Sequence, residues 1–283
     1  MSKPSLLFRC AGGGAIVIGL SGPASATTIN IFADKDTTIF QNQIGNSLGG
    51  GVGMFVGGNN ASSPRRGLLE FDIAAAIPAG ATINSVQLTL YLGQVAGGGP
   101  DADRVIELHR VLADWGEGTE GAGMMIGGTG QGFAAQPGSA TWNQRQFGIA
   151  NWMSLGGDFA PTASQTSLVD DVINVPYSWT TNAAMVADVQ LWLNNPGSNF
   201  GWLLRNQDEL GQQTFRAFFT QDNLAMVPLL TVDFTAPIPE PGTLSLLGLG
   251  LAKLLHSRRR RQQPLPRVCR RRSRPRGSIR SSP

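Results

Sequence analysis

The chain has 283 residues with a pI of about 9.2, but its charges are unevenly distributed. Twelve basic residues and no acidic ones lie between Lys253 and the end, whereas residues 27–236 hold eight basic and eighteen acidic residues, a formal net charge of −10. Because an acidic surface repels a phosphate backbone, this composition excludes nucleic-acid binding by residues 27–236. Both cysteines, Cys10 and Cys269, lie outside this stretch, which excludes a disulfide or a Cys-ligated zinc within it.

Residues 1–26 have the organisation of a secretory signal peptide. Lys3 and Arg9 are basic, Ala11–Leu20 is apolar, and Ala24-Ser25-Ala26 fits the small-residue pattern of a cleavage site. We interpret the segment as a signal cut after Ala26, and the alternative is a disordered N-terminus. The apolar run is short and rich in glycine, which argues against a membrane-spanning helix.

Alternation of apolar and polar residues with a period of two recurs through residues 27–234. Such alternation is typical of strands that are buried on one face of an antiparallel sheet. Turn sequences such as Ile77-Pro78-Ala79-Gly80 separate the runs. The residues expected on buried faces are Leu69, Phe71 and Ile73; Val86, Leu88, Leu90 and Leu92; Ile106, Leu108 and Leu112; and Leu230, Val232 and Phe234.

One segment departs from this alternation. Met185, Val189, Trp192 and Leu193 recur at helical spacing, Thr181 or Asn182 is a suitable N-cap, and Pro196-Gly197 ends the pattern. The sequence therefore predicts an all-β protein, an antiparallel β-sandwich of jelly-roll type, closed at one end by one short helix.

Six tryptophans lie in residues 27–236 and are candidates for stacking against sugar rings. The helical spacing of Trp192 and the apolar run around Trp202 favour the core for both. Trp152 and Trp179 stand in loop-like sequence and are the better candidates for an exposed glycan platform. The alternative for these two is also burial in the core.

Acidic residues suggest two further kinds of site. Asp34 and Asp36, near the first strand, are candidate ligands for a structural Ca²⁺, although no calcium-loop spacing is present and solvated acids are the alternative. Asp114 and Glu117 could form a carboxylate pair for glycoside hydrolysis, but no motif supports those roles. We therefore expect no enzyme activity and no other cofactor.

Three other features have weak functional signals. Arg65 and Arg66 are candidate contacts for an anionic glycan, and a solvated loop edge is the alternative. Residues 49–58 lack the Gly-Lys-Ser/Thr of a phosphate loop and are interpreted as a flexible hairpin or loop. His109 is the only histidine of residues 27–236 and is expected to be a satisfied strand histidine.

The end of the chain has the order of parts of a sorting signal. Pro239-Glu240-Pro241 precedes the apolar run Leu244–Leu255 and the basic cluster Arg258, Arg259, Arg260 and Arg261. A 12-residue helix spans about 18 Å, whereas the hydrocarbon core of a bilayer is roughly 30 Å thick. The run therefore predicts a weak, transient inner-membrane anchor, with the arginines held on the cytoplasmic side.

These 25 residues, 237–261, closely resemble the PEP-CTERM sorting signal of Gram-negative bacteria that make exopolysaccharide. The resemblance implies processing near Pro239-Glu240-Pro241 by an exosortase, a membrane transpeptidase-like enzyme. Lys253 and His256 interrupt the apolar run, and the family normally ends soon after the arginines. Residues 262–283 are a basic tail that is expected to be disordered, either a solvated segment, the product of a shifted reading frame, or an arm for nucleic acid or anionic lipid.

The stretch 27–236 resembles DNRLRE-domain proteins over residues 66–92, 109–118, 189–204 and 215–234, and in Trp115 followed by Thr141-Trp142. That family is similar to carbohydrate-binding modules with β-sandwich folds, which implies binding or scaffolding outside the cell. We therefore expect an exported protein of the cell envelope or the secreted fraction that binds or organises extracellular polysaccharide. A polysaccharide-active enzyme and a ligand-free matrix protein are the alternatives.

Overall fold

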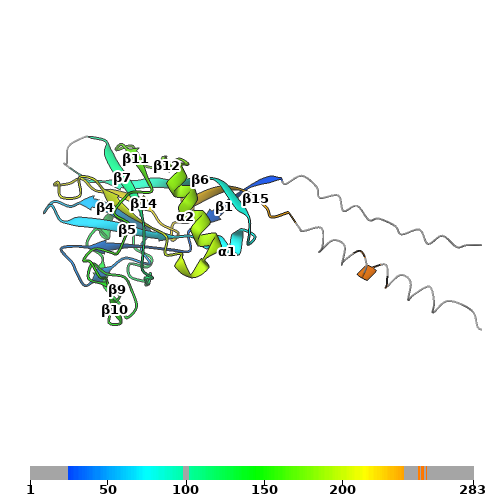
Figure 1. The fold of residues 1–283 in the computed structure, drawn as a ribbon. Coiled ribbons are helices and arrows are strands. Elements are labelled where there is room, and N and C mark those ends of the chain that lie inside the picture. Colours follow the sequence, from blue (N-terminus) through cyan, green and yellow to red (C-terminus); the bar gives the residue numbers. More distant parts are fainter. Residues whose placement is uncertain (1–24, 98–101, 239–247, 249, 252, 254–283) are drawn as a thin grey trace, which may run out of the picture. The chain divides into compact units, whose positions relative to one another are not determined.

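The computed structural model describes residues 25–97, 102–238, 248, 250, 251 and 253. The chain divides into two units, of which residues 23–237 form the folded domain (Figure 1). The strands are β1 Ala26–Phe32, β2 Lys35–Phe40, β3 Asn46–Ser47, β4 Gly53–Gly58, β5 Pro64–Glu70, β6 Thr82–Val95, β7 Arg104–Arg110, β8 Phe133–Ala134, β9 Gln144–Gln146, β10 Ala150–Asn151, β11 Gln165–Val169, β12 Pro176–Trp179, β13 Trp202–Asn206, β14 Arg216–Phe219 and β15 Leu229–Thr235. The α-helices are α1 Ile73–Ala76 and α2 Ala183–Asn194, and short 3₁₀ turns cover Ile126–Gly128 and Pro196–Ser198.

Eleven strands form one curled antiparallel sheet. Its order is β1-β15-β6-β14-β4-β5-β13-β7-β11, with β12 paired to β6 and β2 paired to β5. The two remaining sheets of the described residues are two-stranded ribbons, β10-β9 and β3-β8. The prediction of an all-β antiparallel fold of sandwich type is confirmed.

The sheet turns where β4 meets β5. Only Gly57 and Gly58 of β4 pair with β5, opposite Arg65 and Pro64. Gly57 has φ +116°, and a Cβ on Gly58 would lie 2.0 Å from the carbonyl oxygen of Gly211, so both positions require glycine. Residues 53–58 are a buried strand, whereas residues 49–52 form turns. The prediction of a flexible hairpin or loop was therefore wrong for 53–58, where these glycines accommodate a close approach of backbone.

The main core lies between strands from the two halves of this sheet. It joins Leu69 of β5, Leu108 of β7 and Trp202 of β13 to Val86 of β6 and Val232 of β15. The alternation predicted for residues 86–92 and 230–234 is confirmed, because all of its apolar positions are buried. Each such large side chain contributes roughly 1.5–3 kcal/mol when it is fully buried.

A second core cluster covers the opposite face of β5 and β13. Leu68 of β5 and Leu203 of β13 pack there with three tryptophans. The long segment after β7 contributes these rings, Trp115, Trp142 and Trp152. The middle of β13 is therefore buried on both faces. This arrangement explains the continuous apolar run at residues 202–204 and places three tryptophans of the loop segment in the interior.

Helix α2 forms where the sequence predicts it. The Asn182 side chain caps its start by accepting a hydrogen bond from the Met185 N–H at 2.8 Å. Met185, Val189 and Trp192 are buried, and the Trp192 and Trp202 rings meet edge to face with centroids 4.6 Å apart. Figure 1 shows α2 lying across the sheet, and its packing partner there is β6.

Two predicted strand residues lie elsewhere. Ile73 is buried, but it begins α1 because Asp72 accepts a hydrogen bond from Ala75 N–H and starts a helical turn. Leu112 is 50% exposed because β7 ends at Arg110. Helix α1 was not predicted, since four residues are too few to show a helical period.

The first and last strands of the domain are neighbours. Strand β1 pairs with β15 in antiparallel register, with Ala26 opposite Thr235 and Phe32 opposite Leu229 (Figure 1). The predicted signal cleavage after Ala26 therefore falls at the start of β1.

Candidate functional site

Trp179 is not an exposed platform. It ends β12 with none of its surface exposed, and its indole Nε1–H donates to the Ile106 carbonyl at 2.9 Å. Its ring meets Phe218 edge to face at 5.8 Å. The prediction that this ring stacks on a glycan was wrong, because strand pairing with β6 turns it into the main core.

Trp152 is also largely buried, with 5% of its surface exposed. Its Nε1–H donates to the Thr141 carbonyl at 2.9 Å, which holds the ring in the second core cluster. An open stacking platform at Trp152 is therefore contradicted. Part of the residue nevertheless borders a surface hollow, so Trp152 supplies a wall rather than a platform.

This hollow, which we name the amide hollow, has a volume of about 460 Å³. Among the described residues, no charged side chain lines it. Its lining residues are Ile44, Gly45, Thr141, Asn143, Gln144, Phe147, Asn151, Trp152 and Leu155. The hollow combines uncharged hydrogen-bonding groups with aromatic and aliphatic walls, a composition typical of small-ligand sites.

Two of the amides are fixed by the β9–β10 ribbon. Gln144 Nε2 donates to Asn151 Oδ1 at 2.9 Å, and the Gly148 N–H donates to Gln144 Oε1 at 3.1 Å. These bonds engage both ends of the Gln144 amide and the oxygen of Asn151, which leaves the Asn151 NH₂ group as a donor for a ligand. The hollow was not predicted from the sequence, although four Asn or Gln residues between positions 143 and 151 were a visible signal.

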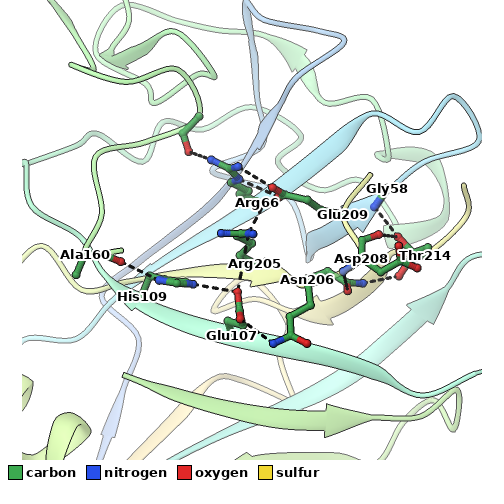
Figure 2. Close-up of polar contacts among 12 residues, drawn as sticks. Gly58, Arg66, Glu107, His109, Ala160, Arg205, Asn206, Asp208, Glu209 and Thr214 are labelled. Atoms are coloured by element: carbon green, nitrogen blue, oxygen red, sulfur yellow. Dashed lines mark hydrogen bonds and ion pairs between the residues drawn. The ribbon is translucent and has the colours of Figure 1, made fainter. Parts of the chain in front are cut away.

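Arg66 is held inside the fold rather than free to meet a glycan. Its Nε and Nη2 donate to the two carboxylate oxygens of Glu209 at 3.0 and 2.7 Å (Figure 2). Nη1 donates to the Gly156 carbonyl at 2.8 Å, and the guanidinium lies 4.8 Å from the Trp142 ring centroid. Both the ligand-contact and the solvated-edge interpretations of Arg66 were wrong, because its guanidinium is engaged in a bidentate ion pair with Glu209.

The Arg66–Glu209 pair belongs to a chain of alternating charges on β5, β7, β13 and the turn that follows β13. Arg205 lies 3.4 Å from Glu209 and 3.9 Å from Glu107, and His109 Nε2 lies 3.1 Å from Glu107 (Figure 2). His109 Nδ1 contacts the Ala160 carbonyl at 2.8 Å. Both ring nitrogens of His109 have partners, so the prediction of a satisfied strand histidine is confirmed.

Arg65 is 3% exposed and so is not a solvated loop edge either. Its Nε and Nη2 donate to the Gly130 carbonyl at 2.7 and 2.5 Å, and its guanidinium lies 5.7 Å from the Phe40 ring centroid. Burial lowers the pKa of Arg65 to about 10. Its role as an anion contact stays a prediction and depends on a second hollow, which Arg65 itself lines.

The structure brings Asp36 together with Glu117. The Asp36 N–H and Gln221 Nε2 donate to Glu117 Oε1 at 2.8 and 2.5 Å, and the Gln221 N–H donates to Asp36 Oδ2 at 2.8 Å. Asp36 is fully buried, and its Oδ1 has no hydrogen-bond partner among the described residues. Three segments distant in the sequence, β2, the loop after β7 and the turn after β14, therefore meet at two carboxyl groups.

This cluster is electrostatically unfavourable to ionised carboxylates. Burial raises the pKa of Asp36 well above its usual range, and the charges of Glu117 and Asp222 raise it further. Burial, together with Asp222 and Asp34, raises the pKa of Glu117 to about 7. In the described part of the chain, no group of three or more His, Cys, Asp or Glu residues could hold a metal ion. Calcium binding at Asp34 and Asp36 stays a prediction.

Asp114 and Glu117 do not share a site. Asp114 accepts a hydrogen bond from Gln146 Nε2 at 3.1 Å and lies 3.9 Å from Lys35 Nζ, whereas Glu117 faces Asp36 and Gln221. The two carboxylates have separate partners. The structure thus gives no support to this pair as the two groups of a glycosidase.

The predicted sorting residues Pro239, Glu240, Pro241 and Arg258–Arg261, the signal peptide up to residue 24 and the tail 262–283 lie outside the described residues. Strand β15 ends at Thr235, two residues before the predicted signal begins. Within the described residues, no helix combines the length and the hydrophobicity that crossing a membrane requires.

Comparison with curated proteins gave no match for the chain. Comparison with protein families gave a match to the PEP-CTERM protein-sorting motif at residues 237–261, the same bounds that the sequence predicts. This motif marks proteins that are exported, processed by an exosortase and sorted through a C-terminal anchor. The chain is therefore an exported protein that is sorted to the cell envelope or the extracellular space through a transient membrane anchor.

Proposed function

We propose that residues 27–236 form a non-catalytic module that binds or organises exopolysaccharide outside the cell. The observation that carries this proposal is the amide hollow, with its volume of about 460 Å³ and its uncharged lining. The resemblance of the same stretch to DNRLRE-domain proteins, which are similar to carbohydrate-binding modules, also favours it.

The chemistry of the amide hollow suits a neutral sugar. Asn and Gln side chains offer both donors and acceptors, as pairs of sugar hydroxyls require, and Phe147 and Trp152 offer apolar surface to sugar C–H groups. An uncharged hollow gives no counter-charge to an acidic sugar. The net charge of −10 on residues 27–236 further disfavours an acidic polymer at this position.

Titration calorimetry with neutral and acidic polysaccharides tests the proposal. The full chain carrying Gln144→Ala and Asn151→Ala should bind a neutral glycan at least tenfold more weakly than the wild type. Gln87→Ala, which removes an exposed amide from β6, is the matched control and should bind normally. Unchanged binding by the double variant, or binding by no member of the panel, would overturn the proposal.

One observation favours a polysaccharide-active enzyme as the second candidate. The pKa of Glu117 is raised to about 7 by burial, in the range that suits a general acid at neutral pH. Release of reducing ends or of unsaturated products from the same glycan panel, lost in Glu117→Gln, would establish this alternative. The binding proposal predicts no release by either protein.

A further inference from the structure

We infer that a second hollow, beside Arg65, binds a ligand that carries a carboxylate with neighbouring hydroxyl groups, such as an acidic sugar residue. This Arg65 hollow has a volume of about 300 Å³, and its polar lining comes from Asn59, Asn60, Arg65, Gln94 and Gln131. Apolar side chains and three glycines complete the lining: Phe55, Ile126, Phe215, Gly127, Gly128 and Gly130. It shares no lining residue with the amide hollow.

The charge of Arg65 has no counter-ion in the described protein. Arg66, Arg104, Arg110 and Arg205 each lie within 4.0 Å of a carboxylate, whereas Arg65 forms no ion pair within that distance among the described residues. A buried cation without an anion is costly, even when carbonyl groups and an aromatic ring solvate part of it. A ligand carboxylate in the adjoining hollow would supply the missing negative charge.

Arg216 is a useful comparison, because it is also 3% exposed and has no ion pair within 4.0 Å among the described residues. The carboxylates of Asp170 and Asp171 nevertheless act on Arg216, and its Nε donates to the Asp170 carbonyl at 2.7 Å. Burial lowers the pKa of Arg65, and no carboxylate of the described residues lies within 4.0 Å of its guanidinium nitrogens.

The Arg65 guanidinium has N–H groups that no acceptor in the described protein uses. A guanidinium has five N–H groups. In Arg65, Nε and one N–H of Nη2 are directed at Gly130, and one N–H of Nη1 lies 3.5 Å from the Ser63 carbonyl. One N–H on each terminal nitrogen is left without a protein acceptor among the described residues. Two N–H groups on neighbouring nitrogens match the two oxygens of a carboxylate.

The other polar walls suit hydroxyl groups. Asn60 Oδ1 accepts from Gln213 Nε2 at 2.9 Å and Gln131 Oε1 accepts from Asn42 Nδ2 at 3.4 Å, which leaves the NH₂ group of both as a donor. Gln94 also lines the hollow, and its Oε1 is buried and has no hydrogen-bond partner among the described residues. Carboxylate recognition by Arg65 and hydroxyl recognition by the amides of Asn60 and Gln131 together describe an acidic sugar.

The test measures the affinity of the full chain for three small probes, D-galacturonate, D-galactose and acetate. NMR titration or calorimetry gives each affinity. Galacturonate should bind, and galactose should bind at least tenfold more weakly because it lacks the carboxylate. Acetate binding as strong as galacturonate binding would overturn the sugar-acid assignment and identify a simple carboxylate site.

Gly127→Trp should obstruct the hollow, because Gly127 lines it and a Cβ at this exposed glycine meets no atom within 4 Å that would oppose the substitution. It should weaken galacturonate binding at least tenfold. Gly197→Trp, at an exposed glycine with equally open surroundings, is the matched control and should bind as the wild type does.

Unchanged galacturonate binding in Gly127→Trp, or no binding by the wild type, would contradict the inference. The amide-hollow variant Gln144→Ala with Asn151→Ala should retain galacturonate binding, which separates this inference from the proposed function.

Discussion

Thr27 lies directly opposite Phe234, so the first and last strands of the exported domain are hydrogen-bonded neighbours. The predicted signal cleavage after Ala26 and the end of β15 at Thr235 fall at the same end of this strand pair. Three residues, 236–238, lie between Thr235 and Pro239, so the four Cα–Cα steps from one to the other can span at most roughly 14 Å. The predicted processing site is therefore close in the sequence to the end of β15.

Strand β1 should contribute to stability through its inward side. Ile31 is 8% exposed and belongs to the main core, whereas the larger Phe32 beside it is 62% exposed. Ile31→Ala should lower the free energy of unfolding by about 2 kcal/mol, the low end for a core residue, because β1 is an edge strand. Chemical denaturation measures this loss. Phe32→Ala is the control, and a greater loss in the control than in Ile31→Ala would contradict the register of β1.

Trp179 should affect stability and not ligand binding. Trp179→Ala should cost about 3–5 kcal/mol, because it removes a fully buried ring and leaves the Ile106 carbonyl without its donor. Thermal unfolding gives the first readout and glycan titration the second. A variant of normal stability with lost glycan binding would show that the ring meets ligand after all.

The Arg66–Glu209 pair should be strongly coupled. Arg66→Met leaves the Glu209 carboxylate, only 6% exposed, without its bidentate partner and should cost about 3 kcal/mol. The double variant Arg66→Met with Glu209→Gln should recover part of that loss. A double-mutant cycle in urea measures the coupling, and additive losses would show that the pair acts as two independent side chains.

Stability should rise as the pH falls from 8 to about 5. The pKa of Glu117 is raised from 4.5 to about 7 in the folded protein, so between these values the folded state holds a proton that the unfolded chain releases. The fold loses this contribution, roughly 1–2 kcal/mol after discounting for the partial exposure of Glu117, as the pH rises from 4.5 through about 7.

The raised pKa of Asp36 acts in the same direction as that of Glu117. Glu117→Gln keeps the acceptor oxygen for Asp36 and Gln221 but removes the charge, so this variant should be more stable than the wild type at pH 8 and less sensitive to pH. Melting temperatures across pH 5–8 test this. A wild type that melts lower at pH 5 than at pH 8 would contradict the assignment.

Much of the fold was predictable from local patterns. The alternation at Val86–Leu92 and Leu230–Phe234, and the capped helical spacing at Met185–Leu193, give each segment one buried face. The turn of the sheet at Gly57 and Gly58 was not predictable, since it depends on a close approach to Gly211 from a distant loop.

The site was less predictable than the fold. Loop-like sequence around Trp152 suggested exposure, but that loop segment folds back over β13 and buries the ring. Arg66 and Glu209 are 143 positions apart, so no local pattern reveals their pairing. Asp36 and Glu117 meet only through tertiary structure, whereas the amides around Gln144 were visible in the sequence as a cluster.

The most direct test of the central claim is mass spectrometry of both termini of the protein isolated from cell-envelope and secreted fractions. Export and exosortase sorting predict a chain that begins near Thr27 and ends near Pro239-Glu240-Pro241, without the arginines at 258–261. An intact chain in the cytoplasm or the inner membrane, still carrying residues 1–26 and the basic tail, would contradict it.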